Sequence, residues 1–175
     1  MRWLAIGFVL AALSSAAEAR CRCRALPIPR CADPAARHAL TVHVDFAVVD
    51  GMAEVITQSG PYQVPVADLE GKTVLAAFMP RGDVFQGFVE EMVTLGVGVM
   101  QGPRATLTTE PAFLPGEYEI LLFIDAAPGG GLGPTRGDLA AFDNTICDPT
   151  GVSVRVAVGC DDATVTLVNR HFIIF

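Results

Sequence analysis

The chain has 175 residues, of which 51% are hydrophobic and 18% charged, and its formal net charge is −7 at pH 7. Nucleic acid and anionic membranes are poor partners for such an acidic surface, because like charges repel. The length matches one domain of ordinary size, which buries enough surface on folding to need no obligatory disulfide.

The first 19 residues have the features of a cleaved secretory signal. Arg2 precedes an apolar run that ends in Ala17-Glu18-Ala19, the small-x-small pattern of a signal peptidase site. The run is shorter than the roughly 20 residues that a membrane span needs. Glu18, Ala19 and Arg20 directly before Cys21 do not fit a lipoprotein signal. We therefore expect a secreted or periplasmic protein without a membrane span after cleavage.

All five cysteines follow this signal, in a compartment where disulfide formation is the default. Cys147 and Cys160 flank a short strand-like run, and closing that loop would stabilise the fold by about 3 kcal/mol in the chain-entropy model. We predict that these two residues pair, and that Cys31 pairs with Cys21 or Cys23. The fifth cysteine is left for an intermolecular bond or a free thiol. The Cys-x-Cys spacing does not match the usual zinc sites.

After a Cys- and Pro-rich linker over 20–36, the segment 40–50 ("LTVHVDFAVVD") alternates between apolar and polar residues. This alternation predicts a half-buried strand. Its expected buried face consists of Val42, Val44, Phe46 and Val48.

Strand-like runs separated by Gly, Pro and Asp turns continue to the end of the chain. They cover residues 52–58, 62–68, 72–80, 84–100, 105–109, 117–125, 152–158, 163–169 and 171–175. This pattern predicts an all-β fold, an antiparallel β-sandwich formed by residues 37–175 as one domain with at most one short helix. Residues 87–96 are the best helix candidate, although a strand or bulged hairpin fits them equally well. A small outer-membrane barrel is less favoured, because the mature chain has two tyrosines and no tryptophan for the aromatic girdles.

The run from Glu117 to Asp125 is expected to bury Tyr118, Ile120, Leu122 and Ile124 and to lead into the glycine-rich loop 126–137. A strand of the form PGxYxVxxFxD, followed by an Asp/Gly-rich loop closed by Gly-Asp, resembles a recurrent bacterial extracellular sandwich. The resemblance covers about residues 113–168. It implies an immunoglobulin-like or transthyretin-like β-sandwich.

The resemblance also implies a calcium site, because this loop often carries Asp-x-Asn-x-Asn-Gly in such domains. The candidate ligands here are Asp125, Asp138 and Asp143. However, Ala127 and Gly129 stand where further oxygen ligands should be, and calcium needs six to eight oxygens. We therefore expect a solvated turn and no cofactor. The two Arg-Gly-Asp tripeptides, at 81–83 and 136–138, are expected to be turn chemistry rather than adhesive motifs.

Catalytic patterns are weak. Neither of the two serines outside the signal lies in Gly-x-Ser-x-Gly, and the histidines His38, His43 and His171 show no metal-ligand spacing. His43 and Asp45 share a strand face, where a solvent-facing polar pair is expected.

The sequence thus favours a secreted bacterial β-sandwich that acts as an interaction or structural module without catalytic activity. Its expected partner is a protein or a second copy of the chain. The alternatives are a calcium-stabilised adhesion-like domain and, less favoured, a small secreted hydrolase.

Overall fold

The computed structural model describes residues 26–57, 60–80, 92–126, 136–141 and 154–174. The elements in chain order are β1 (Leu40–Asp45), β2 (Val48–Val49), β3 (Met52–Thr57), β4 (Gly60–Pro65), α2 (Val66–Leu69), β5 (Thr73–Pro80), β6 (Thr94–Val99), β7 (Arg104–Thr108), β8 (Gly116–Ile124), β9 (Leu139–Ala141), β10 (Val154–Val158), β11 (Ala163–Leu167), the 3₁₀ turn η1 (Asn169–His171) and β12 (Phe172–Ile174).

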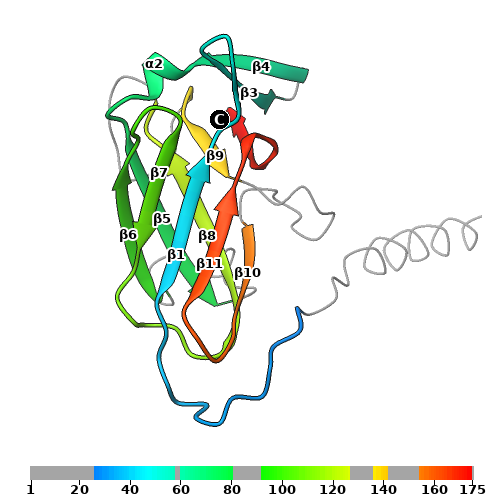
Figure 1. The fold of residues 1–175 in the computed structure, drawn as a ribbon, viewed down its shortest axis with the longest axis vertical. Coiled ribbons are helices and arrows are strands. Elements are labelled where there is room, and N and C mark those ends of the chain that lie inside the picture. The colour runs from blue at the N-terminus through cyan, green and yellow to red at the C-terminus, as the bar shows by residue number, and fades with distance from the viewer. Residues whose placement is uncertain (1–25, 58–59, 81–91, 127–135, 142–153, 175) are drawn as a thin grey trace, which may run out of the picture.

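These strands form two sheets packed against each other (Figure 1). The smaller sheet has the order β11-β1-β7. The larger sheet has the order β2-β3-β12-β9-β8-β5-β6, with β10 paired to β8 and β4 paired to β3. The predicted all-β sandwich is confirmed, and α2 is a single short helix among the described elements.

Most strand pairs are antiparallel, but β1 pairs with β11 in parallel, with Val42 opposite Val165. β12 also meets β3 in parallel, at Ile173 and Ile56. Parallel neighbours need a long connection, and here the strands lie far apart in the sequence. The C-terminal strands therefore close the fold onto the first strands of the domain.

The side chains of alternating residues meet between the sheets, as the pattern predicts. Tyr118 is 9% exposed, and Ile120, Leu122 and Ile124 on the same face of β8 are fully buried. Phe113 lies in the middle of an aromatic cluster, with its ring 5.4 Å from that of Phe78 and 5.0 Å from that of Tyr118. Both contacts are edge-to-face, the geometry that the ring quadrupoles favour.

The first predicted strand is interrupted. Val44 and Phe46 are buried as expected, but Val48 is 39% exposed and belongs to β2. The prediction for Val48 was wrong because the chain leaves the smaller sheet after β1 and enters a hairpin. Asp50 and Gly51 form its turn with φ of 51° and 77°, the two left-handed residues of a type I′ turn.

Two further segments differ from the expected strands. The run predicted over 62–68 ends as a strand at Pro65, and α2 follows it directly. In the run 84–100, the described strand is β6, and residues 84–91 lie outside the described residues.

The described cysteines correct the predicted disulfides. Cys31 pairs with Cys160, with an S–S distance of 2.11 Å and a Cα–Cα distance of 5.2 Å. This bond excludes both predicted pairings of these two residues; Cys21, Cys23 and Cys147 lie outside the described residues. The arrangement of the sheets, rather than closeness in sequence, sets the pairing, because the turn after β10 lies beside the N-terminal segment.

Two more contacts attach the described part of the predicted linker to the domain. The Leu26 amide donates to the Glu117 carboxylate on β8, and Pro29 packs against Gly159, where an added Cβ would lie 3.2 Å from the ring. Glu117 also pairs with Arg155 of β10 at 2.9 Å, and both side chains are at most 10% exposed. Glu117 is therefore a buried, paired carboxylate and not part of a solvated acidic surface.

Among the described residues, no helix is long and apolar enough to cross a membrane.

Candidate functional site

A groove of about 550 Å³ lies where β2, β3 and β4 meet the 3₁₀ turn η1. We call it the ribbon groove, and its lining residues are Ala47, Val49, Met52, Glu54, Val55, Gln63, Asn169 and Arg170. Apolar side chains make up half of this set, and the carboxylate of Glu54 and the guanidinium of Arg170 add opposite charges. Such a mixture of apolar surface and a few polar groups is typical of binding sites.

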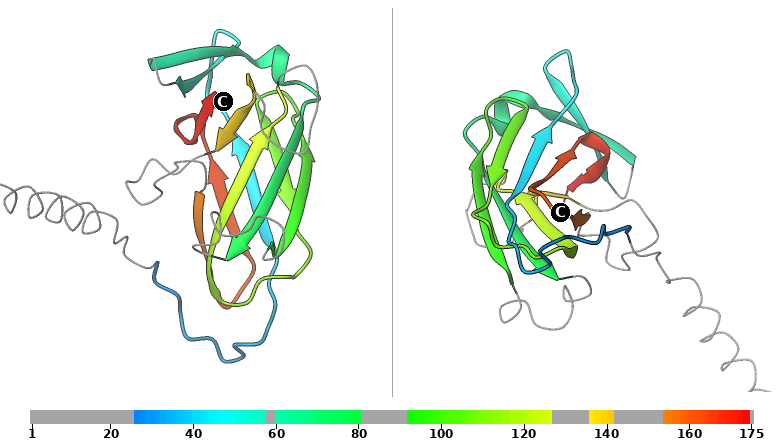
Figure 2. Two further views of the ribbon diagram at one scale, coloured as in Figure 1. Left: turned by 180° about the vertical axis from the view of Figure 1, so that it is seen from behind. Right: turned by 60° about the horizontal axis from the view of Figure 1, so that its bottom comes forward.

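One wall of the ribbon groove exposes an apolar side chain to solvent. Val49 on β2 lines the groove and is 73% exposed, and it lies opposite Met52 of β3. Tyr62 on β4 is 52% exposed but precedes Gln63, which lines the groove, so its side chain lies on the other face of the hairpin. β3 and β4 form a hairpin at one end of the sandwich, near the C-terminal strand (Figures 1 and 2). Val49 and Met52 give the ribbon groove an apolar wall beside its polar groups, as binding sites commonly have.

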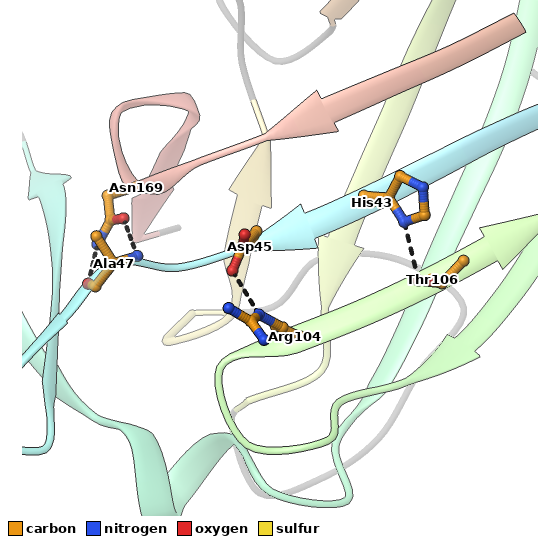
Figure 3. A network of polar contacts seen from close by, with 6 residues as sticks. All are labelled: His43, Asp45, Ala47, Arg104, Thr106 and Asn169. Carbon is orange, nitrogen blue, oxygen red and sulfur yellow. Dashed lines mark hydrogen bonds and ion pairs between the residues drawn. The ribbon is translucent and has the colours of Figure 1, made fainter.

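The opposite wall of the groove is held in place by paired hydrogen bonds. The Ala47 amide donates to Asn169 Oδ1 at 2.7 Å, and Asn169 Nδ2 donates to the Ala47 carbonyl at 2.9 Å (Figure 3). The Val168 amide donates to His171 Nδ1 at 2.9 Å, which closes the turn on itself. On the ribbon side, Gln63 Nε2 donates to the Glu54 carboxylate at 3.1 Å. These hydrogen bonds therefore attach each wall of the groove to the strands and turns around it.

A second polar surface continues from the Ala47–Asn169 hydrogen bonds along the outer face of β1 and β7. His43 Nδ1 lies 3.0 Å from Thr106 Oγ1, and Arg104 Nε donates to Asp45 Oδ1 at 2.8 Å; both contacts are drawn in Figure 3. The strand register explains both contacts, because it places these residues directly opposite each other. A shallow depression of about 280 Å³ covers this face.

His43 and Asp45 share a face, as predicted, but each is hydrogen-bonded to its partner on β7 and not to the other. The hydrogen bond with Asp45, and then the attraction of its charge, raise the pKa of Arg104 above its ordinary value. Both groups of this ion pair are solvent-exposed, where such pairs contribute little to stability. The arrangement is that of a polar, solvent-facing surface.

The candidate calcium ligands are partly brought together. β8 and β9 pair with Ile124 opposite Leu139, so Asp125 directly follows β8 where Asp138 directly precedes β9. Asp138 is 1% exposed, which means that the Arg-Gly-Asp tripeptide at 136–138 does not display its carboxylate. Asp143 lies outside the described residues. No three His, Cys, Asp or Glu residues of the described ranges gather into a metal-holding group.

The three histidines lie in different places. His38 is buried beside Phe113, with which it forms an isolated bridge; His43 faces outward from β1; and His171 belongs to η1. The structure therefore brings none of them together with another.

Comparisons of the chain with protein families, with curated proteins and with solved structures found no match.

The sequence analysis missed the ribbon groove. Asn169 and Ala47 are 122 residues apart, and no local pattern connects them. The available signal was the Val48-Val49 pair directly before the Asp-Gly turn, since two adjacent valines cannot both point into a sheet core.

Proposed function

We propose that this chain is a secreted, non-catalytic β-sandwich whose task is to bind a partner protein through the ribbon groove. The observation that carries the proposal is a groove of about 550 Å³ whose wall includes the 73% exposed side chain of Val49. Protein interfaces combine an apolar centre with a polar rim. Val49 and Met52 supply the apolar contact, and Glu54 and Arg170 supply the polar rim.

The rigidity of the site supports binding rather than a purely structural role. The type I′ turn at Asp50-Gly51 and the two hydrogen bonds of Asn169 fix both walls of the groove before a partner arrives. A preformed surface loses less conformational entropy on association than a surface that must be ordered.

Secretion is part of the proposal. The disulfide between Cys31 and Cys160 supports it, because such bonds persist in the periplasm and outside the cell and are rare in the cytosol. We propose that the signal-like residues 1–19 direct the chain there.

We further propose that the domain is immunoglobulin-like or transthyretin-like, as the sequence resemblance implies. The Tyr118 hydroxyl donates to the Leu114 carbonyl at 2.8 Å, four residues upstream. This contact is similar to the tyrosine corner of immunoglobulin-like sandwiches, in which a tyrosine bonds back to the preceding backbone. It supports a relationship in fold and says nothing about the partner.

The test uses the mature chain (20–175) as bait in extracts of the producing cells. We expect a protein that is captured by the wild type and lost with Val49→Asp, because a charge is placed on the exposed apolar contact surface. Thr164→Asp, on an exposed position of β11, is the matched control and should retain capture. Equal capture by both variants would show that the contact surface lies elsewhere. Turnover of a substrate that is abolished by changing His43 would contradict the non-catalytic proposal.

A further inference from the structure

Arg170, in the 3₁₀ turn η1, is a solvent-exposed cation that lines the ribbon groove. On the strands, Arg104 pairs with Asp45 at 2.8 Å and Arg155 pairs with Glu117 at 2.9 Å. Within the described ranges, by contrast, no carboxylate or carbonyl accepts a hydrogen bond from Arg170. The chain has a net charge of −7, yet the guanidinium in this groove keeps its donors for another molecule.

The turn that carries Arg170 is attached to the sandwich on both sides of this residue. Asn169, directly before it, exchanges two hydrogen bonds with the Ala47 backbone (Figure 3). His171, directly after it, accepts a hydrogen bond from the Val168 amide through Nδ1. The backbone under the Arg170 side chain is therefore positioned before a ligand arrives, which lowers the entropy cost of pairing with it.

The ribbon side of the groove carries the opposite charge. The Glu54 carboxylate, on β3, accepts a hydrogen bond from Gln63 Nε2 at 3.1 Å. In the part of the chain that the structure describes, no ion pair joins Glu54 to Arg170. A negative group on a ligand is repelled by Glu54 and attracted by Arg170, and charges at the edge of an interface decide specificity in this way. The groove therefore directs an anionic group toward η1.

We propose that the ribbon groove binds a segment of a partner protein in which an apolar side chain contacts Val49 and Met52 and a neighbouring Asp or Glu pairs with Arg170. The planar guanidinium matches a carboxylate through two parallel hydrogen bonds. A phosphate, with about two negative charges at pH 7, or a run of acidic residues is repelled more strongly by Glu54 and by the net charge of the chain. The inference rests on the proposed function, because it names the chemistry of the partner in the same groove.

Selection from a random peptide library tests the proposal. The peptides are displayed on phage and fused to the coat protein at their C-terminus, so any carboxylate that is selected belongs to a side chain. On the mature chain we expect peptides with one Asp or Glu beside an apolar residue. Arg170→Glu should select Lys or Arg in place of the acidic residue. Arg30→Glu makes the same change in net charge at an exposed position of the N-terminal segment and should keep the acidic preference.

A selected peptide, synthesised and titrated in solution, measures the contribution of Arg170. We expect Arg170→Met to weaken binding about tenfold or more, because a hydrogen-bonded carboxylate loses its cation. Arg170→Lys keeps the charge without the two parallel hydrogen bonds and should lie between Arg170→Met and the wild type. If Arg170→Glu fails to fold by circular dichroism, this comparison decides.

Two results would overturn the inference, and they separate it from the proposed function. Peptides that are lost with Val49→Asp but show no acidic preference, or that bind Arg170→Met as tightly as the wild type, would leave the groove as a binding surface and refute the pairing with Arg170. Failure to select any peptide that depends on Val49 would contradict the groove as a binding surface and this inference with it.

Discussion

Removal of the disulfide between Cys31 and Cys160 should be the most destabilising change that leaves the core itself intact. The bond joins residues 129 positions apart, so it closes almost the whole domain into one loop. In the chain-entropy model a loop of this length stabilises the folded state by about 5 kcal/mol, by restricting the unfolded chain. The contacts of Leu26 and Pro29 with the domain do not involve the two cysteines, so their contribution to the free energy of unfolding is not part of this value.

The double variant Cys31→Ser/Cys160→Ser, compared with the wild type in urea, measures this value. We expect the free energy of unfolding to fall by up to about 5 kcal/mol and the urea dependence to steepen, since an unlinked chain exposes more surface on unfolding. Changing both residues avoids leaving a lone thiol that can exchange with another cysteine. Ala35→Ser, at an exposed position of the same segment, is the control and should stay within about 0.5 kcal/mol.

Peptide mapping under non-reducing conditions provides the independent check. It should recover a peptide containing Cys31 linked to one containing Cys160. Recovery of a Cys147–Cys160 peptide, together with a loss of only about 3 kcal/mol, would refute the reasoning, because that value belongs to the shorter loop.

Three further predictions concern single side chains. Burial raises the pKa of Tyr118, so the stability that depends on its neutral form is present below about pH 10 and is lost as pH rises through the folded-state value. Tyr118→Phe should lessen the fall in unfolding free energy between about pH 8 and pH 11, and an unchanged fall would contradict this origin. Arg155→Met should cost about 3–5 kcal/mol in urea unfolding, because it leaves the Glu117 carboxylate buried without its cation; a cost below about 1 kcal/mol would show that the pair is effectively solvated. Millimolar calcium should not change the melting temperature, whereas an increase abolished by Asp125→Ala would identify a calcium site.

Much of the fold is visible in the sequence because strand alternation reports directly which side chains are buried. The run that contains Tyr118 and Ile124 shows this, since these two residues and the two alternate positions between them, Ile120 and Leu122, face the core. The same rule fails at Val48, where alternation continues although the chain has left the sheet. Periodicity describes one strand at a time and contains no information about where the next sheet begins.

Neither the disulfide nor the ribbon groove could be predicted from the sequence, and the reason is the same for both. The chain-entropy argument says how much a given loop contributes, but a bond forms only where two Cα atoms lie at a suitable distance, here 5.2 Å. Likewise, Asn169 meets Ala47 only because the C-terminal strands return to the first strands of the domain. Long-range pairings of this kind leave no pattern in a local window of sequence.

Photo-crosslinking from the ribbon groove tests the proposed function most directly. A benzoylphenylalanine is placed at Val49, which lines the groove and is 73% exposed, and in a second variant at Leu114, which is 39% exposed in the loop before β8. In the cells that secrete the protein, we expect irradiation to give a discrete adduct with a partner protein from position 49 and none from position 114. Adducts of equal yield from both positions, or adducts from position 114 alone, would contradict a partner-binding role for the ribbon groove.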